Sequence, residues 1–133
     1  MFNSKLKKEN DELRERLMSL EQVKDSLDSE MLVLQLDPNG RIESVNINFE
    51  KEMVYSNSQL VGRHIEEIVP AHVKPLDFYQ RMKQAIARGE HLNGAFRLLR
   101  GNGEEAWLRS ILQPVRDGNG RIKYFTMHSS DLT

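Results

Sequence analysis

The spacing of apolar residues changes at Met31, and this change constrains the fold more than any other feature of the sequence. Before it, leucines recur every seven residues, which predicts a coiled-coil helix because a heptad repeat keeps one apolar stripe facing a partner. From Met31 the period becomes two, and the stretch MLVLQLD is typical of a β-strand. We therefore expect a coiled-coil helix over residues 1–30 and a globular domain over residues 31–133.

Two sets of residues would face the partner helix in this heptad register. The d positions are Leu6, Leu13, Leu20, Leu27 and Leu34, and the a positions are Asn10, Leu17, Lys24 and Met31. In a parallel pair, Glu9 would face Arg14 and Arg16 would face a glutamate, so both flanking pairs have opposite charges. The sequence therefore predicts a parallel homodimer through Leu6, Asn10, Leu13, Leu17, Leu20 and Leu27. The alternative is a single amphipathic helix lying on its own domain.

Residues 31–133 read as two strands, several short helices, one longer helix and three strands. The expected strand connections PNG, GNGE and DGNG contain glycine, as tight hairpin turns need. The segment PLDFYQRMKQAIARGE is expected to form the longer helix, which Gly89 would end. This order predicts an α+β fold, in which a five-stranded antiparallel sheet carries helices on one face.

Composition narrows the classes of function. The formal net charge of −1 offers no basic excess for binding nucleic acid. The sequence has no apolar run of membrane length and no signal-peptide pattern, so we expect a cytoplasmic protein without direct membrane contact. It contains no cysteine, which excludes thiolate metal sites and a cysteinyl–flavin adduct. No nucleophile stands with a base and an orienting partner, so we expect no enzyme activity.

Five stretches together resemble the PAS sensory domain: DPNGRIESVN, LVGRHIEEIVP, ARGEHLNGAFRLLRGNGEEAWLRS, QPVRDGNGRIKYF and SSDLT. The resemblance covers Met31 to Thr133, and it is closest in look to the PAS domains of bacterial chemotaxis and aerotaxis transducers. It implies a sheet with strand order 2-1-5-4-3, with helices on its concave face that often enclose a ligand. The chain departs from the family at Val54-Tyr55, where many relatives carry Gly-Tyr.

The resemblance also gives a role to Asp131 and Thr133, the polar residues of the terminal DLT. In the family, a D-x-T triplet ties the end of the last strand to the first turn of an output helix. Asp131 would bond to backbone or to a basic side chain near the strand end, and Thr133 would cap the next helix. The resemblance therefore implies a downstream signalling domain on the same polypeptide.

Histidines are the candidate cofactor ligands. His64, His72, His91 and His128 have no spacing for a shared metal site, although a single histidine can hold a haem iron axially. His72 is the first candidate, because it precedes the longer helix and is expected to face the region where relatives hold a cofactor; His64 is the second. Haem b is the first cofactor considered, with FAD or no cofactor as alternatives.

Trp107 on the fourth expected strand has two interpretations. It either contacts a flavin or haem, or lies on the outer sheet face against the coiled coil or a partner subunit; we favour the second. The function expected from the resemblance is a sensory PAS module of a chemoreceptor-type protein. The module would bind a cofactor or small ligand and relay the change through dimeric helices. The alternative is a ligand-free PAS domain for dimerisation or protein interaction in a sensor kinase or other regulator.

Overall fold

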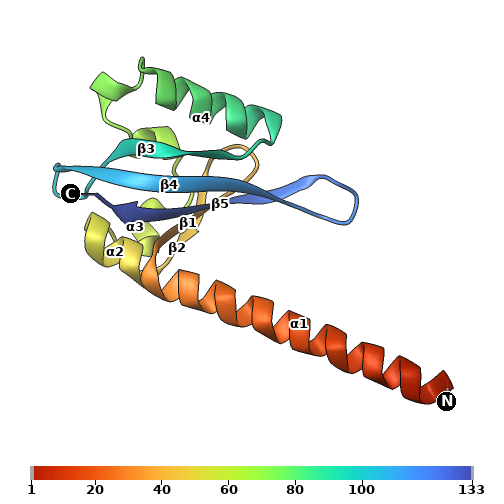
Figure 1. Cartoon of the computed structure of the whole chain (residues 1–133). Coiled ribbons are helices and arrows are strands. Elements are labelled where there is room, and N and C mark those ends of the chain that lie inside the picture. The colour runs from red at the N-terminus through yellow and green to blue at the C-terminus, as the bar shows by residue number, and fades with distance from the viewer. Residues whose placement is uncertain (1, 133) are drawn as a thin grey trace. The chain divides into compact units, whose positions relative to one another are not determined.

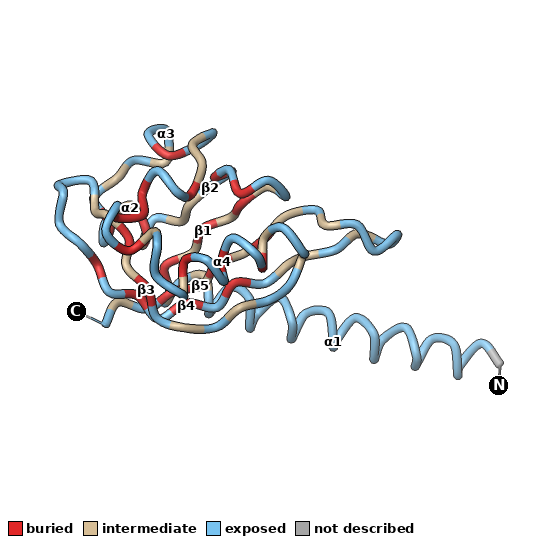
Figure 2. The backbone as a smooth tube through the Cα atoms, turned by 90° about the horizontal axis from the view of Figure 1, so that it is seen from above, coloured by how far each residue is buried: buried red, intermediate tan, exposed pale blue. Residues whose placement is uncertain are grey.

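The computed structural model describes residues 2–132 and divides the chain into two compact units, residues 1–30 and residues 31–133. The first unit is helix α1 (Phe2–Glu30), which is exposed along nearly its whole length (Figure 2). Its apolar side chains from Leu6 to Leu27 are all exposed. The predicted helix is therefore confirmed, while the partner helix stays a prediction.

The heptad repeat does not continue past Leu27. Met31 follows the end of α1, and Leu34 lies in strand β1 (Leu32–Leu36), where its side chain is 0% exposed. Placing Leu34 at a d position and Met31 at an a position was therefore wrong. Leu34 is buried because the side chains of a strand alternate between its two faces, which puts it beside Leu32 and Leu36 on the core face.

The second unit is built on one antiparallel sheet of five strands (Figure 1). After β1, the strands are β2 (Ile42–Val45), β3 (Leu92–Leu99), β4 (Glu105–Arg116) and β5 (Ile122–Asp131). Their spatial order is β2-β1-β5-β4-β3, as expected from the resemblance. The first and last strands of the domain therefore pair with each other, and β2 and β3 form the two edges.

Short helices connect β2 to β3. They are α2 (Ile47–Met53), α3 (Asn57–Leu60), the 3-10 turns η1 (Ile65–Ile68) and η2 (Ala71–Val73), and α4 (Asp77–Arg88). Asn46 begins α2 by accepting a bond from the Phe49 N–H at 2.9 Å, and Gly89 ends α4 in the left-handed conformation at φ 69°. Helices α2, α3 and α4 pack against β1, β2 and β3 respectively.

The core lies between these helices and one face of the sheet. In β4, Ala106, Leu108 and Leu112 are buried, whereas Trp107 and Arg109 between them are exposed. Buried residues of the strands join those of the helices in a single cluster. Full burial of a large apolar side chain contributes about 1.5–3 kcal/mol, so this cluster holds the helices on one face, as expected.

Candidate functional site

Three polar side chains meet where the last strand ends. Asp131 is the final residue of β5, Arg100 directly follows β3, and Glu52 lies in the last turn of α2. The Arg100 guanidinium lies 2.8 Å from the Asp131 carboxylate and 3.9 Å from the Glu52 carboxylate. It also donates to the Glu52 backbone carbonyl. We call these three residues the Arg100 cluster; it confirms that Asp131 bonds to a basic side chain near the strand end.

The Arg100 cluster holds two carboxyl groups beside one guanidinium. Hydrogen bonding to Asp131 raises the pKa of the Glu52 carboxyl, and burial and the Asp131 charge act in the same direction. The Arg100 charge opposes them. Arg100 and Asp131 are largely buried, with side chains 14% and 19% exposed, so their ion pair is better shielded from solvent than a surface pair.

Backbone geometry brings α2 to the end of β3. Val54 follows α2 in the left-handed conformation, at φ 60° and ψ 47°, which a β-branched residue adopts only under strain. Gly101 then donates from its backbone N–H to the Met53 carbonyl at 2.8 Å. A Cβ atom on Gly101 would lie 1.8 Å from the Val54 carbonyl oxygen, so only glycine fits this approach. These contacts place Glu52 beside Arg100.

Thr133, the second expected relay residue, lies outside the described residues. Leu132 is the last one described, and its N–H donates to the Trp107 carbonyl at 2.8 Å. The backbone after Asp131 therefore still follows β4, which fixes the direction in which the chain leaves the sheet.

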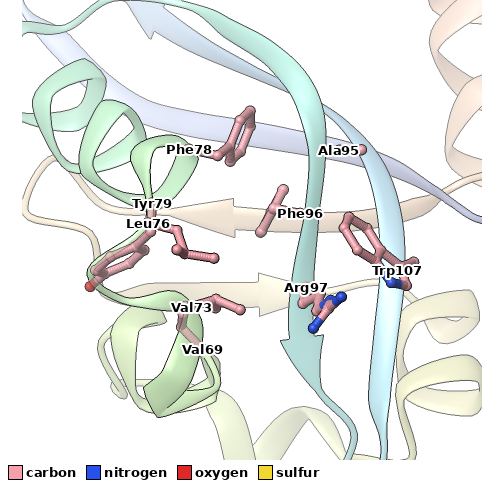
Figure 3. Close-up of a pocket in the computed structure, with 9 residues that line it drawn as sticks. All are labelled: Val69, Val73, Leu76, Phe78, Tyr79, Ala95, Phe96, Arg97 and Trp107. Carbon is pink, nitrogen blue, oxygen red and sulfur yellow. The ribbon is translucent and has the colours of Figure 1, made fainter.

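The second feature is an apolar pocket of about 150 Å³ against the edge strand β3 (Figure 3). We call it the β3 pocket. Its walls come from the end of η1, from η2, from the start of α4, and from β3 and β4. The lining residues are Val69, Val73, Leu76, Phe78, Tyr79, Ala95, Phe96, Arg97 and Trp107.

Strand alternation explains how the β3 pocket is lined. Phe96 faces the core and is 8% exposed, and its ring stacks on that of Phe78 with centroids 5.2 Å apart. Ala95 and Arg97, its neighbours in β3, point to the opposite face of the sheet. The Arg97 guanidinium lies 4.4 Å from the centre of the Trp107 ring. The pocket therefore combines aromatic walls with one cation.

Tyr79 lies where the β3 pocket meets α4. Its hydroxyl donates to the Glu66 carboxylate at 3.3 Å, and its ring is buried. Burial raises the pKa of Tyr79 to about 12, and the Glu66 charge and hydrogen bond add to this. The phenol is therefore neutral at physiological pH and serves as a hydrogen-bond donor.

Neither candidate cofactor histidine lines the β3 pocket. His72 is exposed on η2, pairs with Glu105 at the start of β4 and does not line the β3 pocket. His64 caps η1: its Nδ1 accepts from the Glu66 N–H, and its Nε2 lies 3.0 Å from the Asn39 carbonyl. Both ring nitrogens of His64 are therefore engaged.

The β3 pocket does not fit a haem. The β3 pocket has the volume of a benzene-sized cavity, far below that of a macrocycle. On the helix-covered face, Phe49, Met53, Leu98 and Phe125 are 0% exposed and fill the space between helices and sheet. The assignment of His72 as a haem ligand stays a prediction that this geometry does not support, and a three-ring flavin meets the same obstacle.

Between residues 2 and 132, no group of three or more His, Cys, Asp or Glu side chains is arranged to hold a metal ion. Within the same range, no helix combines the length and the apolar character that crossing a membrane would need.

The sequence predicted one end of the Arg100 cluster and missed the other. Asp131 was found through the DLT triplet, but Arg100 and Glu52 lie 31 and 79 positions earlier in the chain, and only the fold brings them together. No local signal locates them, because Gly101, whose N–H reaches the Met53 carbonyl, has the pattern of an ordinary hairpin-turn glycine in the sequence. The outer-face placement favoured for Trp107 is confirmed, since its side chain is 40% exposed.

Comparison with known proteins agrees with this architecture. The sequence pattern of the PAS fold family matches residues 28–133. The biofilm dispersion protein BdlA of Pseudomonas aeruginosa is 29% identical over 107 residues, which cover 80% of this chain and 26% of that protein. The oxygen sensor protein DosP of Escherichia coli is 28% identical over 109 residues, which cover 82% of this chain and 13% of that protein. The chain thus spans about a quarter or less of these relatives.

Solved structures share the fold at lower sequence identity. A light-oxygen-voltage domain studied with a flavin analogue superposes with a TM-score of 0.74 at 18% identity, covering 85% of each chain. A PAS domain from Colwellia psychrerythraea superposes with a TM-score of 0.70 at 20% identity, covering 86% of this chain and 97% of the other. The sheet order, the helices on one face and the matched residues lead to one conclusion: this chain belongs to the PAS fold family.

Proposed function

We propose that this chain is the sensory module of a chemoreceptor-type signalling protein, in which a ligand-dependent change in the PAS domain reaches an output helix through the Arg100 cluster. One observation carries the proposal: Asp131 is joined through Arg100 to both β3 and α2. A shift of α2 or β3 therefore changes the contacts of the residue at which the chain leaves the sheet. Such a change biases two states of a coupled element.

Relay through two copies would follow from the heptad of α1. Its exposed leucines would pair in a parallel homodimer, so that a small rotation in each PAS domain becomes a relative movement of two helices. Membership of the PAS family and the similarity to the oxygen sensor protein DosP support a sensory role. The proposal places the module in the cytoplasm and assigns it no catalytic reaction.

The alternative is a PAS domain that binds no ligand and serves only in dimerisation or protein interaction. The core beneath α2 favours it, because Phe49, Met53 and Phe125 are fully buried there. The β3 pocket favours the sensor, since it offers a separate, partly open place for a small molecule. A ligand that binds there and changes the output would decide between the two.

The relay is tested with Asp131→Asn in the full-length receptor. The variant keeps the size of the side chain but removes the charge that Arg100 holds. We expect the PAS domain to stay folded, with its melting temperature lowered by a few degrees, while signalling becomes locked or loses its ligand dependence. Exposed Asp77, which pairs with Arg81 on α4, provides the matched control in Asp77→Asn.

Signalling and thermal melting are measured side by side on these two variants. Unchanged ligand-dependent signalling in Asp131→Asn would show that the triplet only marks the boundary of the domain. A melting temperature lowered so far that the domain unfolds would instead assign Asp131 to the fold, and Arg100→Gln would then have to show the same loss.

A further inference from the structure

The β3 pocket has the size of one aromatic ring. Its volume is about 150 Å³, and apolar cavities of that volume hold a benzene molecule. Its lining is almost entirely apolar and includes the rings of Phe78, Tyr79, Phe96 and Trp107 (Figure 3). Aromatic rings attract one another in offset or edge-to-face contacts, so the rings of Phe78, Tyr79 and Phe96 on the helix side of β3 favour an aromatic guest over an aliphatic one of equal volume.

Arg97 supplies a positive charge at the wall of this pocket. Its guanidinium stacks on Trp107, and it forms no ion pair with a carboxylate of residues 2–132. Glu105, two residues before Trp107 in β4, is instead paired with His72. Arginine binds carboxylates through two parallel hydrogen bonds, and stacking on an aromatic face leaves the edge of the guanidinium available for them.

From these features we infer that the β3 pocket binds a small aromatic monocarboxylate. The ring would lie against Phe78, Tyr79 and Phe96 on the helix side of β3, and the carboxylate would pair with Arg97, which lies with Trp107 on the other side of this edge strand. This inference rests on the proposed sensory function and names the ligand class of that sensor. It places the ligand at the β3 edge rather than beneath the helices, where the core is filled.

Phenylacetate is the probe, and phenylacetamide, which has nearly the same shape and no charge, is its matched control. Trp107 is the only tryptophan of the chain and lines the pocket, so its fluorescence reports occupancy directly. Calorimetry on the same protein gives an independent binding curve. We expect saturable binding of phenylacetate and a dissociation constant for the amide that is about tenfold or more higher, because a charge-assisted pair is lost.

Three variants localise the contact, and a fourth is the control. Arg97→Gln should weaken phenylacetate about tenfold or more and remove the preference for the acid over the amide. Arg97→Lys should retain part of that preference, since it keeps the charge without the fork. Ala95→Leu fills the pocket from an exposed strand position and should weaken acid and amide alike. Arg121→Gln, in the turn before β5, removes an exposed charge elsewhere and should change neither.

The inference fails if phenylacetate gives no saturable signal, if acid and amide bind equally to the unchanged protein, or if Arg97→Gln binds phenylacetate as tightly as Arg121→Gln does. Melting curves confirm that each variant is folded. Failure here leaves the relay through the Arg100 cluster standing, because Asp131→Asn tests that relay without this ligand. Conversely, phenylacetate that binds through Arg97 without altering the receptor's output would establish the ligand class and contradict the sensory function.

Discussion

Val54 stands near a position where the family resemblance leads one to expect glycine. Many PAS domains carry glycine near this position, and the structure shows the reason: the residue after α2 has φ 60°, which glycine adopts without strain. The left-handed conformation is strained for a valine. Val54 is 48% exposed, so packing offsets little of this strain. The strain lies next to Glu52 and therefore next to the Arg100 cluster.

Replacing Val54 with glycine should stabilise the domain. A left-handed conformation costs an ordinary residue about 1–2 kcal/mol, and the greater freedom of glycine in the unfolded chain returns about 0.4–1 kcal/mol of that. We expect Val54→Gly to raise the free energy of unfolding by about 0.5–1 kcal/mol, measured by urea denaturation. Val61→Gly, at an exposed position with φ −57°, is the control and should destabilise. A less stable Val54→Gly would mean that the valine side chain packs usefully.

The raised pKa of the Glu52 carboxyl predicts that the stability of the domain depends on pH. Its pKa is raised in the folded domain, so the protonated form is favoured there. The stabilisation that comes from this raised pKa is complete below the ordinary glutamate pKa and is lost as the pH rises through the raised value. Glu52→Gln should therefore melt at a higher temperature than the unchanged protein at neutral pH, with the difference vanishing on acidification.

The matched control for Glu52→Gln is Glu90→Gln, which removes an exposed carboxylate just beyond α4. Differential scanning calorimetry across the acid range compares the two variants. An equal gain in both would reduce the effect to a change in net charge, and a loss of stability in Glu52→Gln at neutral pH would show that attraction to Arg100 outweighs repulsion from Asp131.

At the scale of elements, the helices and strands that could be predicted are those whose sequence signals are local. The hairpins, α4 and the stop at Gly89 follow from turn residues and periodicity, and all are present. The predicted heptad repeat extended beyond the end of α1, because Leu34 fits both a period of seven and a period of two. The contact of His72 with Glu105 could not be predicted, because the direction in which a side chain points from a one-turn 3-10 helix depends on tertiary contacts that no local pattern encodes.

Helix α1 should form the interface of a homodimer. Leu13 and Leu20 occupy d positions and are 60% and 67% exposed, so a homodimer through α1 would bury both. Leu13→Glu combined with Leu20→Glu should convert the dimer to a monomer in analytical ultracentrifugation. Met18→Glu alters an equally exposed side chain outside the a and d positions and should leave the dimer intact. A double variant that stays dimeric would move the interface away from α1.

At the scale of the whole molecule, the fold class could be predicted because order, spacing and motifs agree across the entire domain. The candidate site could be predicted only at Asp131, where the family triplet is continuous in sequence. The β3 pocket was out of reach, since Arg97 and Trp107 are brought together by the register of two strands, and Val73 joins them only after η2 folds against the sheet edge. Such a site depends on three-dimensional packing rather than on a motif.

The pairing of β1 with β5 has a consequence for how such a domain spreads among proteins. Leu32, at the start of β1, is opposite Ser129, near the end of β5. Paired strands lie about 5 Å apart, so the chain enters and leaves the sheet at neighbouring points. A domain whose two ends lie close together can be inserted into a loop of another protein without disrupting the fold of that protein. The same geometry makes residues 31–132 suitable for insertion into other proteins to build chimaeric receptors.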